Sequence, residues 1–191
     1  SEQLDAVTAA VVHDIGKLTV PKNIKGKDIL TQEEQEAVRM AQIQGHNLID
    51  IVFSSSPNVK RICAQAQRAL ESLESGEDIS SMKMVKGAKV LAVAETFDTM
   101  TAMQVEKAPD SEVAAIKHLL ENPQVYDSDV VRALIRSINI LAPGVSVELN
   151  TGEKALVLNA NEQNVLEPMI LMFGDNSIVD LSDREMFGAL E

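Results

Sequence analysis

The chain has 191 residues, 45% of them apolar and 24% charged, which suits one domain with a sizeable core and a small appendage. Its formal net charge of −12 excludes nucleic acid and anionic lipid as broad-surface partners, because both require clustered lysine and arginine. The single Cys63 permits no intrachain disulfide and fits a reducing, cytoplasmic compartment. No apolar run approaches the roughly 18 residues of a membrane span, so we expect no membrane contact from this segment.

Apolar residues recur at helical spacing through the first 140 residues. Val7, Val11 and Val12, with Leu4 one turn earlier, are expected to bury one face of the first helix. The pair Thr31 and Glu34 has the spacing of a capping box that opens a long second helix. The pattern predicts helices over 1–14, 31–53, 57–73, 84–103, 111–120 and 127–140, with 84–103 the most apolar and central to the core.

The period of the hydrophobic pattern changes to two after Pro143 and Gly144. The segments VSVEL, KALVLNA and PMILMF read as strands, and residues 150–152 as a hairpin turn. We therefore predict a mostly α chain, with a helical domain over 1–141 and a small β-rich C-terminal appendage over 142–191.

Adjacent His13 and Asp14 stand at the closing turn of the first helix. Gly16 follows at a position typical of a helix end, and Lys17 lies in the loop beyond it. An imidazole and a carboxylate can ligate a divalent metal, and a lysine can hold a phosphate. The dipeptide alone is more often surface or capping material. The lysines at 17, 22, 25 and 27 favour a solvated loop, with an electropositive rim to an anion pocket as the alternative.

Three segments in order, HDIGKLTVPKNI, ILTQEEQEAVR and GAKVLAVAETFDTMT, resemble the HD-GYP branch of the HD phosphohydrolases. The resemblance extends from about residue 3 to the end of the chain. It implies an HD-type helical bundle and a metal-dependent phosphodiesterase of bacterial cyclic-dinucleotide signalling, chiefly of cyclic di-GMP. Such domains normally have helices before the His-Asp helix, so we expect this chain to be a fragment or to have lost its front end.

Four motif blocks carry the ligands of two or three metals in that family, and only the first, His13-Asp14, is intact here. The histidine of the second block, four residues before Gly45, corresponds to Ala41. The His-His-Glu run of the third block corresponds to residues 65–67, which read Gln, Ala, Gln, and no Gly-Tyr-Pro follows. In the fourth block Glu95 replaces an aspartate, and its extra methylene moves the carboxylate.

The remaining candidate residues are few. An arginine and a tyrosine that the resemblance implies as ligand contacts correspond to Gln104 and Glu106. His46 is expected on the polar surface of the second helix, because five residues turn the helix by roughly 140° away from Ala41. His118 is expected on a helix face.

The predicted metal ligands are therefore His13, Asp14 and Glu95, with Lys17 binding phosphate. They allow at most one weakly held divalent metal ion and no dinuclear site. We expect a degenerate, non-catalytic HD-GYP domain that acts as a binding or regulatory module in cyclic di-GMP signalling. Its partner would be a cyclic dinucleotide or a signalling domain such as a diguanylate cyclase. The alternatives are a residual metal-dependent phosphohydrolase of the cyclic di-GMP phosphodiesterase class with a reduced site, or a structural domain that forms a homodimer.

Overall fold

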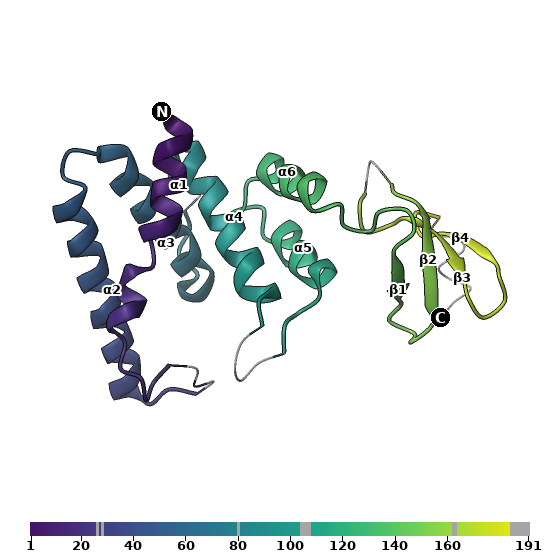
Figure 1. Cartoon of the computed structure of the whole chain (residues 1–191), viewed down its shortest axis with the longest axis horizontal. Coiled ribbons are helices and arrows are strands. Elements are labelled where there is room, and N and C mark those ends of the chain that lie inside the picture. Colours follow the sequence, from purple (N-terminus) through teal and green to yellow (C-terminus); the bar gives the residue numbers. More distant parts are fainter. Residues whose placement is uncertain (26, 28, 80, 104–107, 162–163, 184–191) are drawn as a thin grey trace. The chain divides into compact units, whose positions relative to one another are not determined.

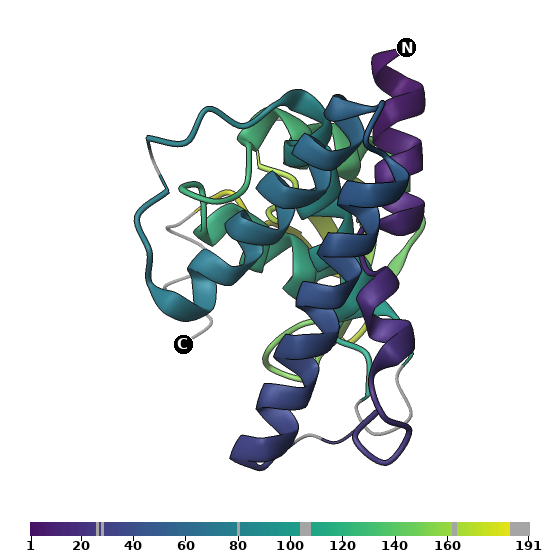
Figure 2. The ribbon, with the colours of Figure 1, turned by 90° about the vertical axis from the view of Figure 1, so that its left-hand side faces the viewer.

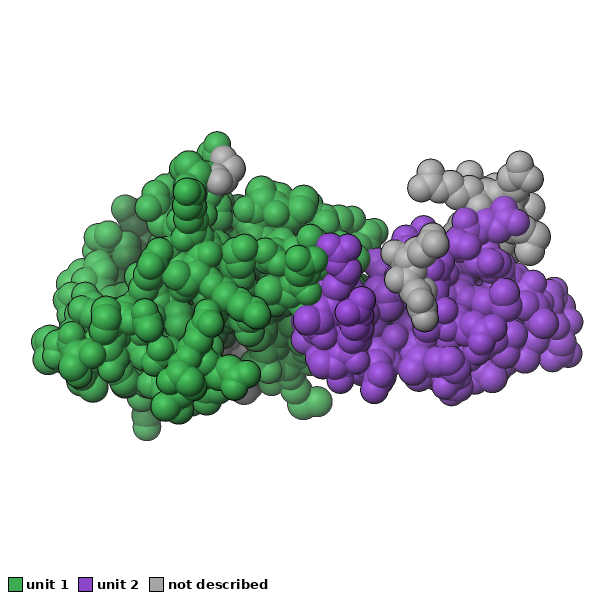
Figure 3. All heavy atoms as spheres, turned by 90° about the horizontal axis from the view of Figure 1, so that it is seen from above, with its two compact units in different colours: residues 1–131 green, residues 132–191 purple. Residues whose placement is uncertain are grey.

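The computed structural model describes residues 1–25, 27, 29–79, 81–103, 108–161 and 164–183. Its contacts divide the chain into two compact units, Ser1–Val131 and Arg132–Glu191, coloured separately in Figure 3. The predicted boundary after residue 141 lies inside the second unit. A mostly helical chain with a β-rich C-terminal part is the predicted fold class, and it is confirmed.

The helices lie close to the predicted ranges (Figure 1). A single 3-10 turn occupies part of the predicted loop, and the Thr31 and Glu34 capping box opens the second helix as expected. The elements are α1 (Glu2–Val12), the 3-10 turn η1 (Ile15–Thr19), α2 (Gln32–Val52), α3 (Pro57–Ser75), α4 (Lys86–Thr101), α5 (Glu112–Glu121) and α6 (Ser128–Ile138).

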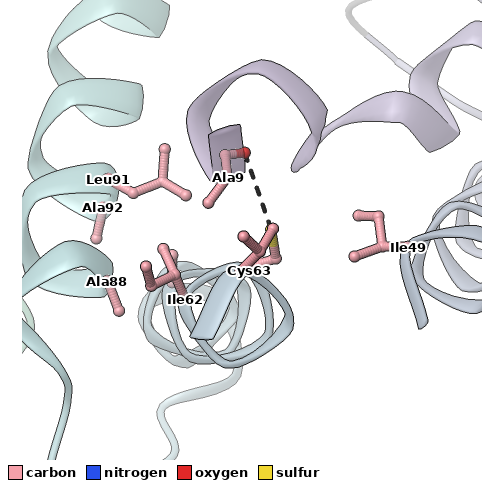
Figure 4. Packing of buried hydrophobic residues seen from close by; sticks show 9 residues of the cluster. Ala9, Ile49, Ile62, Cys63, Ala88, Leu91 and Ala92 are labelled. Carbon is pink, nitrogen blue, oxygen red and sulfur yellow. Dashed lines mark hydrogen bonds between the residues drawn. The ribbon is translucent and has the colours of Figure 1, made fainter. Parts of the chain in front are cut away.

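The core of the first unit lies where α1, α3 and α4 pack together (Figure 4). Small side chains make the contact between α1 and α3: the Cys63 thiol lies 3.8 Å from the Ala9 carbonyl, and Asn58 hydrogen-bonds Asp5. The two helices therefore run in the same direction. Buried alanine and leucine residues of α4 complete the cluster, so α4 is central, as predicted.

The predicted buried face of α1 is correct for Val12, which packs against the core, and wrong for the other three residues. Leu4, Val7 and Val11 are between 62% and 75% exposed, whereas Ala9 is fully buried. The large side chains dominate a hydrophobic pattern, but the helix approaches α3 and α4 most closely through its small residues. The side chains of Leu4, Val7 and Val11 therefore point away from the core.

The second unit contains the later part of α6 and a four-stranded antiparallel sheet in the order β1-β2-β3-β4. Its strands are β1 (Ser146–Glu148), β2 (Lys154–Asn159), β3 (Met169–Met172) and β4 (Ile178–Asp180), and the last was not predicted. Gly152, with φ +83°, supplies the left-handed residue of the predicted turn between β1 and β2. One face of the sheet is buried. Among the described residues, none of the helices has the length and apolar character needed to cross a membrane.

Candidate functional site

The end of α1 is held against α2 by a close approach of two backbones. A Cβ atom at Gly16 would lie 2.4 Å from the Ala41 carbonyl oxygen, and one at Gly45 would lie 2.6 Å from the Gly16 nitrogen. Only glycine fits at both positions. The contact fixes η1 on α2, and with it the residues just before η1, His13 and Asp14.

Glu95 on α4 joins the end of α1 through both oxygens of its carboxylate. Oε2 lies 2.9 Å from Nε2 of His13, and Oε1 accepts a hydrogen bond of 3.0 Å from the Lys17 ammonium. Lys17 also lies 3.5 Å from Oδ2 of Asp14. The His13 and Glu95 side chains are only 16% and 21% exposed. Two carboxylates and two basic groups thus form one compact network of balanced charge.

Both ring nitrogens of His13 face acceptors. Nδ1 donates to the Ala10 carbonyl oxygen at 2.9 Å, and Nε2 faces the Glu95 carboxylate. Neither oxygen can donate, so the geometry favours the doubly protonated imidazolium. The hydrogen bond with Glu95 raises the pKa of His13 against the opposing effect of burial. In return, the hydrogen bond from His13, followed by the contact with Lys17, lowers the pKa of Glu95 to about 2.

A small cavity of about 40 Å³ adjoins this network. It has room for roughly one or two water molecules or one ion. Its lining comes from the two residues after α1 and from η1, α2, α3 and α4: His13, Asp14, Gly16, Lys17, Gln42, His46, Gln67, Leu70 and Glu95.

The structure does not support the predicted surface position of His46. Its ring is half-buried and lines the cavity, and Nδ1 lies 3.1 Å from the Gln42 carbonyl oxygen. His46 follows the buried Gly45 by one residue, or about 100° of helix. His46 and Gln42 therefore lie beside the buried residues of α2, on the side of the helix that faces α3 and α4. The proximity of His46 to a buried glycine was the signal that could have found it.

Comparison with known proteins assigns the first unit. The family model described as HD domain matches residues 1–130. The chain belongs to the HD-domain family. No solved structure gives a significant match.

A curated relative of this HD domain is cyclic di-GMP phosphodiesterase PA4108 of Pseudomonas aeruginosa. It is 25% identical over 170 residues, which cover 88% of this chain and 41% of the relative. The chain thus spans about two fifths of the length of that protein. The predicted HD-superfamily resemblance is confirmed by the family match.

The residues at positions where the resemblance implies metal ligands lie in different surroundings in this HD domain. Gln65 turns away from the cavity: its amide accepts from the Val85 backbone N–H at 2.8 Å and donates to the Lys83 carbonyl at 3.2 Å. Ala66 is buried in the core, whereas Gln67 lines the cavity. Ala41 is buried at the contact with Gly16 and is absent from the cavity lining.

The residues of this HD domain fit a divalent metal poorly. Within the described part of the chain, no three of the His, Cys, Asp and Glu side chains are grouped closely enough to hold an ion. The imidazole of His13 offers no lone pair while both nitrogens carry protons. Gln104 and Glu106, which the resemblance implies as ligand contacts, lie outside the described residues. His118 lies on α5, as predicted, with its ring 6.0 Å from that of Tyr126.

A larger cavity, of about 390 Å³, lies at the opposite end of α1. Residues from the first turns of α1, α3 and α4 line it, and none of the predicted site residues does. The cavity beside His13 and this one are therefore separate features of the domain.

Proposed function

We propose that this chain is a non-catalytic HD domain, a degenerate member of the HD-GYP branch, that serves as a binding or regulatory module in cyclic di-GMP signalling. The family match and the cyclic di-GMP phosphodiesterase of Pseudomonas aeruginosa support the signalling context. The occupant would be a cyclic dinucleotide or a signalling protein domain.

The single observation that carries the proposal is that the Glu95 carboxylate already binds two other side chains. Both oxygens of its carboxylate are hydrogen-bonded, one to His13 and one to Lys17. A metal ion would have to displace two cationic groups and remove a proton from His13 before it could bind. Lys17 likewise lies beside two carboxylates, which offset its charge and weaken its attraction for a phosphate. His13 and Lys17 thus supply the positive charge that a metal would otherwise bring to the carboxylates.

The volume of the cavity supports the same proposal. Sites for drug-sized ligands are typically about 300–1,000 Å³. A cavity of about 40 Å³ is too small to hold a cyclic dinucleotide in contact with His13 and Asp14. A nucleotide bound by this domain would therefore sit elsewhere or require the site to open.

Metal analysis and a turnover assay test the proposal together. The purified chain, loaded with Mn²⁺ or Fe²⁺ and desalted, should retain less than one tightly bound ion per chain and should leave cyclic di-GMP intact. PA4108 assayed in parallel provides the active comparator. Stoichiometric metal with turnover that His13→Ala abolishes and His118→Ala preserves would defeat the proposal. Calorimetric titration with cyclic di-GMP then separates nucleotide binding from a purely structural or protein-binding role.

The position of His46 favours one alternative, a residual mononuclear phosphohydrolase. His46 brings a second imidazole to the cavity shared by His13, Asp14 and Glu95, which is large enough for one ion. In that case Lys17 would hold the phosphate of the substrate. The alternative requires Glu95→Gln and His46→Ala each to lower both metal content and activity on phosphodiesters. Unchanged metal content in both variants would exclude it.

A further inference from the structure

The cavity at the first turns of α1, α3 and α4 has a volume of about 390 Å³, within the range of about 300–1,000 Å³ that is typical of small-molecule sites. It lies at the end of α1 marked N in Figures 1 and 2. Its lining is apolar at Ile62, Val85 and Gly87. Exposed Glu2 and Arg61 also line it, so the cavity reaches the surface. It therefore has room for one unit of a nucleotide that the smaller cavity cannot hold.

Charged side chains of opposite sign line the polar part of this cavity. Glu2 and Asp5 come from α1, whereas Arg61 comes from α3. Oδ2 of Asp5 accepts a hydrogen bond of 3.0 Å from the Asn58 amide, which leaves Oδ1 for another donor. Among the described residues, neither Glu2 nor Arg61 takes part in an ion pair. The cavity thus offers carboxylate acceptors and a guanidinium donor that are not paired with one another.

The start of α4 adds backbone donors beside the guanidinium. The helix begins at Lys86 without a side-chain cap, so its first N–H groups lack partners within the helix. Gly87, its second residue, lines the cavity. A guanidinium and the N–H groups at a helix start both suit phosphate oxygens. The donors on α3 and α4 therefore favour an anionic group, while the carboxylates on α1 favour a group that donates hydrogen bonds.

We propose that this cavity binds one guanylate unit of a cyclic dinucleotide, with the phosphate against Arg61 and the start of α4. The guanine base then lies against Glu2 and Asp5. Its N1–H and exocyclic amino group are adjacent donors that one carboxylate accepts together, whereas adenine has no donor at N1. The second guanylate extends from the mouth of the cavity. This inference rests on the proposed role of the chain in cyclic di-GMP signalling.

The experiment is calorimetric titration of the full 191-residue chain with cyclic di-GMP in buffer that contains a metal chelator. The wild-type chain should bind the ligand and should bind cyclic di-AMP at least about tenfold more weakly, because adenine leaves the carboxylates unpaired. Arg61→Ala and Glu2→Gln should each raise the dissociation constant for cyclic di-GMP by about tenfold or more. Both side chains are exposed, so circular dichroism and thermal unfolding should remain as in the wild-type chain.

Two matched controls make the result specific to this cavity. Arg68→Ala removes another exposed arginine of α3, outside the cavity lining. Glu112→Gln changes a carboxylate in the first turn of α5. Neither control should alter the dissociation constant, and effects equal to those of Arg61→Ala and Glu2→Gln would overturn the proposal in favour of a general effect of charge.

The outcomes separate this inference from the proposed function. Binding of cyclic di-GMP that Arg61→Ala and Glu2→Gln leave unchanged overturns the assignment to this cavity, although the signalling role stands. Equal affinity for cyclic di-AMP overturns the contact between guanine and the carboxylates. A chain that binds no cyclic di-GMP overturns the inference, and leaves a non-catalytic role in binding a protein domain. Turnover of cyclic di-GMP would instead contradict the proposed function.

Discussion

Nε2 of His13 lies 2.9 Å from Oε2 of Glu95, although 82 residues separate the two in the sequence. This contact joins the end of α1 to α4 beside the cavity. The resemblance to the HD-GYP branch assigns both side chains to metal ligation, yet here they bind one another directly. The pKa values of the pair therefore report on whether His13 and Glu95 bind one another in solution.

The pKa of His13 in the metal-free chain should lie above its ordinary value of 6.5, because the Glu95 carboxylate stabilises the imidazolium. Glu95→Gln removes the negative charge and should lower that pKa. NMR titration of the His13 ring protons measures both values. The ring signals of His118 on α5 are the internal control and should coincide in the wild-type and variant chains at any one pH. A His13 pKa below 6.5 in the wild-type chain would contradict the network.

The same pair should make the stability of the chain depend on pH within a defined window. The raised pKa of His13 contributes stability in full below 6.5 and loses it as pH rises through the folded-state pKa. The lowered pKa of Glu95 contributes above 4.5 and loses it as pH falls toward about 2. Urea unfolding should therefore show the largest destabilisation by Glu95→Gln, about 1–3 kcal/mol, between about pH 4.5 and 6.5. A difference that stays constant from acid to alkaline pH would argue against the pair.

Gly45→Ala should destabilise the chain, although alanine normally favours a helix over glycine by about 1 kcal/mol. A Cβ there would meet the Gly16 backbone, which cannot move without shifting η1. We expect a loss of about 1–3 kcal/mol in the free energy of unfolding. Gly87→Ala is the matched helical control, because its new Cβ would meet mainly the flexible end of Ile62 and should cost less. Equal losses in the two variants would show that the α2–η1 contact is looser than described.

Gln65 occupies a position where the resemblance implies a metal ligand, yet its amide holds the segment that enters α4. Gln65→Ala removes hydrogen bonds to Val85 and Lys83 and should cost about 1–2 kcal/mol in thermal or urea unfolding. Gln65→His, which restores the residue type of the family, should destabilise the chain similarly without raising its metal content. Gln67→Ala, at the cavity, is the control and should have a smaller effect on unfolding. A gain of bound metal in Gln65→His would contradict this assignment.

The helices were predictable because their caps and periodicity are local. Thr31 and Glu34 mark the start of α2 within one residue, and the Pro57 break ends the preceding loop. The buried face of α1 was not predictable from side-chain size, because the contact with Cys63 depends on small residues such as Ala9. The short strand β4 has too few residues for an alternating pattern to be visible.

The candidate site was likewise predictable where local sequence determines it and unpredictable where it depends on helix packing. His13 and Asp14 stand out because they are adjacent, and Glu95 because a motif surrounds it. The direct bond between His13 and Glu95 depends on the parallel packing of α1 and α4, which no local pattern encodes. The prediction for His46 considered only its angle around α2 from Ala41. The cavity lies on the side of α2 next to buried Gly45, where His46 is found.

Asp127 combines a helix cap with an ion pair in the first unit. Its Oδ1 accepts from the Asp129 and Val130 backbone N–H groups, and its Oδ2 lies 2.7 Å from the Lys89 ammonium on α4. The hydrogen bond from Lys89 lowers the pKa of Asp127 below its ordinary value of 3.8, so its contribution is present above that pH and is lost as pH falls through the lower folded-state pKa. At neutral pH, Asp127→Ala should cost about 1–2 kcal/mol in urea unfolding, most of it from the cap, because Lys89 is partly exposed and its pairing is screened. Lys89→Met should cost less than about 1 kcal/mol, and a double-mutant cycle isolates the pair. If Lys89→Met costs as much as Asp127→Ala, the ion pair rather than the cap anchors the start of α6.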